Sequence, residues 1–307
     1  MKKRVLIPLI TFLLLIIVIV IFALKIPFSD INKLETHFVS IKVSKGGDAS
    51  YEIVKKKPKN WVFLKDISKD AVQAIMLSED WFFYGHNGVD LSQLKEAALD
   101  GLKSGKVRGA STISQQVVKN LFLSNERTMQ RKFGELLITL YLEKKISKDK
   151  ILEIYLNIIQ YGKGLYGIKK ASRHYFRKNP KKLSAYEGAF LAMLLPSPVR
   201  YAQSFKEKKL TKFAKKTMDS IIDKMVLAKV LTKKEAQREK KRRLGFIKKG
   251  RVKGAGNMQK VKSNDDGRNW EKRYHYDPDL SVKEDFKYDP DAINDEDLNV
   301  QEEFKLD

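Results

Sequence analysis

The 307-residue sequence contains no cysteine and only four histidines. The missing cysteines exclude disulfide bonds and thiolate chemistry, and the histidines show no metal-ligand spacing. Acidic residues are also scarce, since 37 Asp and Glu stand against 61 Lys and Arg and leave a formal net charge of +24. A surplus of that size predicts anionic partners, for which nucleic acid and anionic membrane are the two obvious classes.

A hydrophobic run near the N-terminus favours the membrane. Residues 5–24 carry no charge and are mainly Leu, Ile, Val and Phe, and a helix of that length spans a hydrocarbon core of ~30 Å. Because Lys2, Lys3 and Arg4 precede the run, the positive-inside rule predicts a cytoplasmic N-terminus and an external remainder. A cleaved signal peptide is the alternative, but no small-x-small cleavage site follows. The sequence therefore predicts a cytoplasmic stub and uncleaved anchor over residues 1–25 and disfavours nucleic acid.

The middle of the chain has helical patterns. Residues 26–59 are mixed and basic, which is typical of a juxtamembrane linker with one or two short strands such as Phe38–Val43. From residue 67 to about 246 the apolar residues recur at spacings of three and four, and Ser68 precedes the first helix as an N-cap. Further helices are expected over residues 128–146, 148–159, 184–195, 217–227 and 232–243.

The C-terminal part separates its charges. Residues 206–262 hold 21 Lys or Arg against 5 acids, whereas residues 277–307 hold 3 Lys against 12 acids. We expect a basic-to-acidic, disordered tail over residues 249–307. Its acidic end is either solvated without a partner or folded back on the basic surface.

Two adjacent carboxylates, Glu79 and Asp80, end an apolar helix and meet the aromatic run Trp81–Tyr84. A carboxylate beside apolar rings loses solvation, so its pKa should rise toward that of a useful general base. A helix end with solvated acids is the alternative, and this pattern alone does not decide between the two.

Polar side chains also gather in residues 109–120. Thr112 and Gln115 fit a capping box that starts a helix. Free N–H groups and the positive end of the helix dipole then predict an anion site, to which Gln116 and Lys119 add donors. An ordinary capped helix is the alternative, but it needs neither two glutamines nor a lysine.

Two later clusters are weaker signals by themselves. Arg131 and Glu135 are four residues apart and share one helical face, where a surface ion pair is the alternative. Gly162, Gly164 and Gly167 follow a helix and predict a tight backbone turn against another element.

With a fifth block, Glu187–Ala192 and Pro196–Tyr201, these clusters resemble in order and spacing the glycosyltransferase domain of peptidoglycan polymerases. That family includes monofunctional transglycosylases and the first domain of bifunctional penicillin-binding proteins. The likeness places the domain at residues 60–248, with departures at Thr139 and Lys163, where alanine and asparagine are usual. No Lys-Thr-Gly follows, so the chain resembles the monofunctional type without a transpeptidase domain.

The resemblance implies a mainly α, lysozyme-like glycosyltransferase domain behind one N-terminal transmembrane helix in the bacterial cytoplasmic membrane. It implies an enzyme that polymerises lipid II into glycan strands by inverting transfer with release of polyprenyl diphosphate. The implied partners are lipid II, the growing lipid-linked strand, membrane lipids and other cell-wall synthesis proteins. A lysozyme-like glycan-cleaving enzyme and a catalytically silent cell-wall scaffold are the alternatives.

The resemblance also assigns residues. Glu79 is the expected base and Glu135 the second essential acid, which either orients the neighbouring cations or helps to hold a divalent cation, Mg²⁺ or Mn²⁺, on the diphosphate. Residues 121–130 either dip into lipid or pack in the core. The expected substrate-binding residues are Asp80, Phe83, His86, Ser111, Thr112, Gln115, Gln116, Lys119, Arg131 and Lys132.

Overall fold

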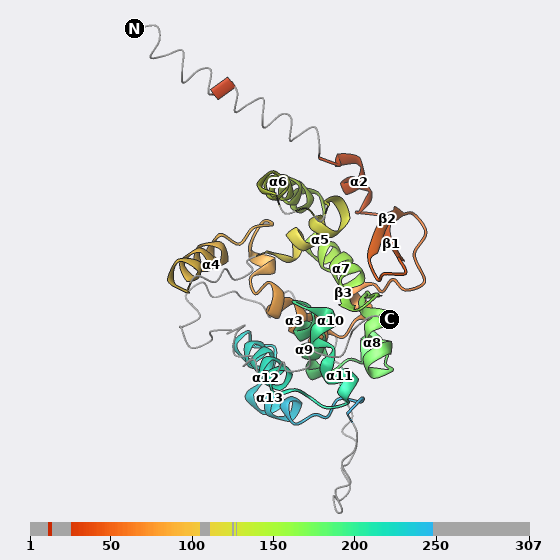
Figure 1. Ribbon diagram of the computed structural model, residues 1–307, viewed down its shortest axis with the longest axis vertical. Coiled ribbons are helices and arrows are strands. Elements are labelled where there is room, and N and C mark those ends of the chain that lie inside the picture. The colour runs from red at the N-terminus through yellow and green to blue at the C-terminus, as the bar shows by residue number, and fades with distance from the viewer. Residues whose placement is uncertain (1–11, 14–25, 105–110, 125, 127, 248–307) are drawn as a thin grey trace, which may run out of the picture.

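The computed structural model describes residues 12–13, 26–104, 111–124, 126 and 128–247. This part of the chain is mainly helical, as the apolar spacing predicts, with two small sheets (Figure 1). The predicted span at residues 5–24 lies outside it apart from Phe12 and Leu13, and so does the tail over 249–307. Among the helices that are described, none combines the length and the apolar character needed to cross a membrane.

The elements follow one another in the order α2, β1, β2, η1, α3, η2, α4 to α7, β3, β4, α8, η3 and α9 to α13. Their bounds are α2 Phe28–Lys33, β1 Phe38–Val43, β2 Ala49–Val54, η1 Leu64–Asp66, α3 Lys69–Glu79, η2 Phe83–Gly85, α4 Leu91–Ser104, α5 Ile113–Phe122, α6 Met129–Lys145, α7 Lys148–Ile158, β3 Gln160–Gly162, β4 Leu165–Tyr166, α8 Ile168–Phe176, η3 Pro180–Lys182, α9 Ala185–Leu194, α10 Pro198–Tyr201, α11 Gln203–Glu207, α12 Lys212–Leu227 and α13 Lys233–Lys240.

The centre of the molecule is α9. All ten of its residues are buried, as expected for a helix that is apolar on every side. Helices α3 and α12 pack against it, and α5 packs against both α6 and α7 (Figure 1). Helix α9 therefore packs against one helix that precedes it in the chain, α3, and one that follows it, α12.

Polar caps fix where these helices begin. The Ser68 side chain accepts from the N–H of Ala71, and Ser184 forms a capping box with Glu187. The predicted helix starts at these two positions are confirmed. By contrast, α12 begins at Lys212, five residues before the predicted start, because the Thr211 side chain accepts from the N–H of Ala214 and caps the helix there.

The segment predicted as a linker carries folded structure. Strand β1 matches the predicted strand Phe38–Val43, and it pairs antiparallel with β2 so that Phe38 faces Val54 and Val43 faces Ala49. The hairpin packs on α7, and Ile31, Leu34 and Val39 are buried in the same core as α9. Residues 28–54 are thus part of the folded unit.

Helix α7 ties the following segment to the core through buried polar groups. The Trp61 indole donates to Glu153 over 3.0 Å, and the Asn157 side chain exchanges hydrogen bonds with both backbone groups of Val62 at 2.9 and 2.8 Å. Satisfied buried polar groups of this kind specify one arrangement of neighbouring elements. They hold the chain that leads into α3 and its terminal carboxylates.

Close contact between α3 and α9 depends on Gly188, because a Cβ there would lie 2.5 Å from the Cα of Ala71. We expect Gly188→Ala to lower the free energy of unfolding by about 1–3 kcal/mol through overpacking. The control is Gly134→Ala in α6, where an added Cβ meets no atom within 4 Å, and it should gain up to ~1 kcal/mol. Denaturant unfolding of both variants checks this, and equal stability of the two would contradict the close packing.

Candidate active site

Glu79 is the last residue of α3 and meets donors from two other helices. Its Oε2 accepts from Nε2 of Gln116 on α5 at 3.0 Å and from the hydroxyl of Tyr155 on α7 at 3.3 Å. Burial raises the pKa of Glu79 above its ordinary value of 4.5, although these two hydrogen bonds and Lys224 on α12 oppose the shift. The rise and its cause agree with the expectation drawn from the adjacent aromatic residues.

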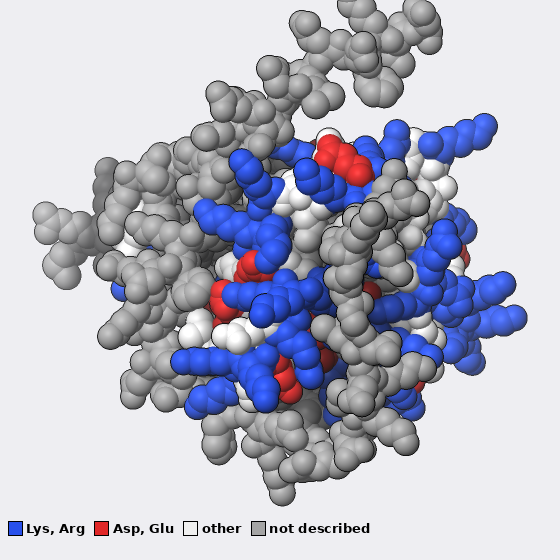
Figure 2. Space-filling view, turned by 90° about the horizontal axis from the view of Figure 1, so that it is seen from below, with Lys and Arg blue, Asp and Glu red and all other residues white. Residues whose placement is uncertain are grey.

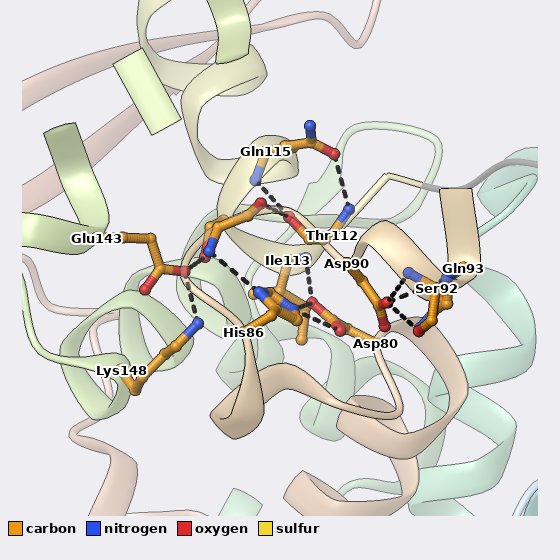
Figure 3. A network of polar contacts seen from close by, with 12 residues as sticks. Asp80, His86, Asp90, Ser92, Gln93, Thr112, Ile113, Gln115, Glu143 and Lys148 are labelled. Atoms are coloured by element: carbon orange, nitrogen blue, oxygen red, sulfur yellow. Dashed lines mark hydrogen bonds and ion pairs between the residues drawn. The ribbon is translucent and has the colours of Figure 1, made fainter. Parts of the chain in front are cut away.

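Asp80 directly follows Glu79 in the chain and holds the start of α5 (Figure 3). Its side chain is almost fully buried and accepts from the N–H of Ile113 at 2.9 Å and from Nε2 of His86 at 3.0 and 3.1 Å. The N–H of Gly88 donates to the other ring nitrogen of His86 at 3.1 Å. Because that nitrogen accepts, the His86 proton sits on Nε2 and faces Asp80.

The predicted capping box at the start of α5 is confirmed. The Thr112 side chain accepts from the N–H of Gln115 while the Gln115 side chain accepts from the N–H of Thr112, and the Thr112 hydroxyl donates to the carbonyl of Gly88 at 2.7 Å. With Ile113 bound to Asp80, three of the first N–H groups already have protein partners. The N–H groups of Thr112, Ile113 and Gln115 are therefore engaged within the protein, and the carboxylate at this helix start is that of Asp80.

Cations gather instead farther along the chain, around an open pocket of about 470 Å³. Glu135 on α6 is buried in its wall, and its two carboxylate oxygens accept from Arg131 Nη1 at 3.1 Å and Lys132 Nζ at 2.5 Å. Nε of Arg131 is buried without a hydrogen-bond partner among the described residues. The full lining comprises Ser111, Lys119, Thr128, Met129, Arg131, Lys132 and Glu135. This pocket, called the cationic pocket below, thus presents three cations and one carboxylate.

Helix α5 connects the carboxylate to the cations. Gln116 contacts Glu79, and Lys119 lies one turn farther along and lines the cationic pocket. Residues three apart share a helical face, so a molecule that reaches Glu79 along this face also meets Lys119. The arrangement can remove a proton at one end and stabilise negative charge at the other.

The expected site residues divide into two groups. One group lies at Glu79 or lines the cationic pocket, and its members are Glu79, Ser111, Gln116, Lys119, Arg131, Lys132 and Glu135. The other group is buried and holds the first in place, and its members are Asp80, Phe83, His86, Thr112 and Gln115. Phe83 has no exposed surface and lies under the Lys148 ammonium, 4.4 Å from its ring centre, so it supports the site from beneath.

The residues expected to contact lipid also divide. Leu121, Phe122 and Leu123 pack against the core, whereas Met129 is 86% exposed beside the cationic pocket. Core packing therefore accounts for Leu121, Phe122 and Leu123, whereas Met129 presents an apolar side chain at the surface.

Sequence reasoning missed several contributors. Tyr155 lies within the apolar pattern of α7 and reads as a core residue, yet its buried hydroxyl bonds Glu79. Glu143 accepts from the Ser114 hydroxyl and from Lys148 at 2.6 Å (Figure 3), and so braces α5 from the end of α6. No local pattern signals the contact of Tyr155 with Glu79 or of Ser114 with Glu143, because these partners lie 76 and 29 residues apart in the sequence.

Comparison with known proteins identifies relatives of this site. A family model described as Transglycosylase matches residues 47–226. Penicillin-binding protein 2D of Bacillus subtilis is 41% identical over 194 residues, which are 63% of this chain and 27% of the relative. Penicillin-binding protein 1F of the same organism is 37% identical over 253 residues, which are 80% of this chain and 34% of the relative. The biosynthetic peptidoglycan transglycosylase of Shewanella oneidensis is 46% identical over 144 residues, which are 47% of this chain and 62% of the relative. The chain thus spans less than two thirds of each of these relatives.

The raised pKa of Glu79 predicts a pH-dependent effect on stability. A carboxylate whose pKa is raised on folding stabilises the folded state below its unfolded pKa, and that stabilisation disappears as the pH rises through the folded pKa. Glutamine has nearly the shape of glutamate but carries no charge, so a protein with Gln at this position does not lose stability in this way as the pH rises. We therefore expect Glu79→Gln to melt at a higher temperature than the parent protein at about pH 8, with the gap closing toward about pH 4.

Thermal unfolding followed by circular dichroism across this pH range provides the measurement. Glu52→Gln is the matched control, since Glu52 forms an exposed pair with Lys42 and such pairs contribute little. A gap for Glu79→Gln that stays constant with pH would show that Glu79 is not an unfavourably buried carboxylate.

Proposed function

This chain belongs to the transglycosylase family, and from that premise we propose that it polymerises lipid II into peptidoglycan glycan strands. The observation that carries the proposal is that α5 places Gln116 against Glu79 and Lys119 in the cationic pocket. One helix thereby links a carboxylate of raised pKa to a site for a diphosphate. The same proposal assigns the domain a lysozyme-like fold.

In the proposed reaction a hydroxyl of the acceptor sugar attacks the anomeric carbon of the lipid-linked donor. Glu79 takes the hydroxyl proton, the new glycosidic bond forms with inversion, and the bond to the diphosphate breaks with its electron pair. A carboxylate of raised pKa is a stronger base than a solvated one. Gln116 and Tyr155 hold its Oε2 in place, which leaves Oε1 to face the substrate.

The leaving group distinguishes this reaction from glycan cleavage. An alkoxide leaving group needs a carboxylic acid to protonate it, whereas a diphosphate departs as an anion. Asp80 is buried under two partners, and both oxygens of Glu135 accept from cations. Neither of these described carboxylates is therefore free to serve as the second member of the pair that glycan cleavage needs beside Glu79, while Lys119, Arg131 and Lys132 suit a diphosphate. A silent scaffold would need neither the raised pKa nor the pocket.

We assign Glu135 the role of orienting cations. Its bonds to Arg131 and Lys132 hold both side chains at the cationic pocket, where their positive charges suit a phosphate. In the described part of the chain no three metal-binding side chains cluster, and the Glu135 carboxylate is already engaged. These residues do not fit a protein-held divalent cation.

The same proposal includes a place in the cell. Residues 5–24 would anchor the chain in the bacterial cytoplasmic membrane with the catalytic domain outside, where lipid II, the growing strand, membrane lipids and other cell-wall synthesis proteins are its partners. N-terminal sequencing of the membrane-extracted protein tests the anchor. A mature chain that begins after residue 24 would show that the run is a cleaved signal peptide.

The direct test of the activity uses purified protein and lipid II. The parent protein should yield polymer, and its rate should fall with decreasing pH through a value above the ordinary 4.5 of a glutamate. Glu79→Gln should lose ~10²–10⁴ in rate because it cannot accept a proton, while it keeps lipid II binding. Glu52→Gln serves again as the control. Cleaved glycan, or no product from the parent protein, would contradict the proposal.

The diphosphate role of the cationic pocket predicts that lysine cannot replace Arg131. Lysine keeps the charge but lacks the planar fork that binds two phosphate oxygens. The loss of one charge-assisted hydrogen bond corresponds to roughly 10–100-fold in kcat/KM. Arg238→Lys on exposed α13 is the matched control. If Arg131→Lys turns over lipid II at the parental rate, Arg131 is a structural partner of Glu135 only.

A further inference from the structure

The C-terminal helices form a strongly basic end of the molecule. Residues 206–243 hold 15 Lys or Arg against 5 acids, and Figure 2 views this end with Lys and Arg side chains spread across it. The acids are already engaged by neighbours: Asp219 by Lys215, Asp223 by Lys240, Glu239 by Arg242, Glu207 by Gln203 and Glu235 by Thr232. The surplus positive charge is therefore not compensated within this segment.

A second pocket, separate in its lining from the cationic pocket, combines lysines with aromatic rings. Lys57, Lys169 and Lys181 line a cavity of about 260 Å³ together with Trp61, Phe63 and the single carboxylate Asp66. Among the described residues, none of these three lysines forms an ion pair within 4.0 Å. We call this cavity the lysine–aromatic pocket.

The lysines of this pocket repel one another. Nζ of Lys169 donates to the backbone carbonyl of Lys59 at 2.7 Å. Its pKa is lowered by burial and then by the charges of Arg173, Lys57 and Lys59. Lys57 rests on the Phe63 ring, 4.8 Å from its centre. An anionic ligand with an aromatic group would relieve the repulsion and cover the rings.

We propose that this chain's own acidic segment, residues 284–289, docks in the lysine–aromatic pocket. Its sequence is Glu-Asp-Phe-Lys-Tyr-Asp, in which three carboxylates flank two aromatic rings and one lysine. The carboxylates match the three lysines, and a ring matches the wall formed by Trp61 and Phe63. The inference does not depend on the catalytic activity proposed above.

The end of the described chain lies close to this pocket. Phe246 stacks on Phe176 at the end of α8, with ring centres 6.3 Å apart, and Lys169 lies near the start of that same helix. Seven residues of helix correspond to about 10 Å. The 37 residues between Ile247 and Asp285 can extend to about 130 Å, so the tether does not limit the contact.

A tethered ligand has an advantage over a free polyanion or a lipid surface. Its effective concentration reaches the millimolar range for a flexible link, so weak exposed contacts become populated. The interaction should fade with salt, because charges at the surface are screened over about 8 Å at physiological ionic strength. Docking would compensate part of the basic charge of the domain from within the same molecule.

The test places a photo-cross-linking benzoylphenylalanine at Phe286 in the full-length protein. Irradiation should give an intramolecular cross-link, mapped by mass spectrometry to residues of the lysine–aromatic pocket. Lys57→Glu with Lys181→Glu should lower its yield by about tenfold, since each reversal replaces attraction by repulsion. Both lysines are exposed, and unchanged circular dichroism should show that the fold is retained.

The matched control reverses two exposed lysines elsewhere, Lys95 on α4 and Lys144 on α6. The same total charge change should leave the cross-link intact. A further variant, Lys57→Glu with Lys181→Glu, Glu284→Lys and Asp285→Lys, should restore the yield. Cross-links outside the pocket, cross-links only between molecules, or equal losses in the control and the pocket variant would each overturn the proposal.

Discussion

The buried carboxylate of Asp80 is the constraint on which the candidate site depends. It follows directly after α3 in the chain, yet it accepts from the first N–H of α5 and from His86. A carboxylate at a helix N-terminus is favoured by the helix dipole, and burial makes its loss costly. Asp80 thus connects the C-terminal end of α3 to the N-terminus of α5. Gln116 then meets Glu79, and Lys119 meets the cationic pocket, because both lie on the helix that Asp80 fixes.

The local features of the fold could be predicted from the sequence because they depend on neighbours a few residues apart. The caps at Ser68, Thr112 and Ser184, and the strand Phe38–Val43, follow from such patterns. The roles within the site could not be predicted in this way. Tyr155 reaches a carboxylate 76 residues earlier in the chain, and the N–H of Ile113 at the start of α5 is bound by Asp80, 33 residues earlier, which only the tertiary fold brings there.

The positive charges of the two basic pockets are compensated to different extents. In the cationic pocket Glu135 bonds both Arg131 and Lys132, so their mutual repulsion is compensated before any ligand arrives. This keeps the two side chains in fixed positions, and a ligand must compete with a carboxylate for them. In the lysine–aromatic pocket Lys169 is surrounded by cations, with Asp66 as the single lining carboxylate. The first arrangement favours a defined geometry, and the second favours capture of whatever anion is nearest.

The central position of α9 has a consequence for biosynthesis. Helix α3, which carries Glu79, precedes α9 in the chain, whereas α12, which packs on α3 and on α9, follows it. A chain made from the N-terminus onward therefore presents α3 long before its last supporting helix has been synthesised. Lys224, which favours the ionised form of Glu79, arrives with that same helix. The site should accordingly acquire its final geometry only after residue 227 has left the ribosome.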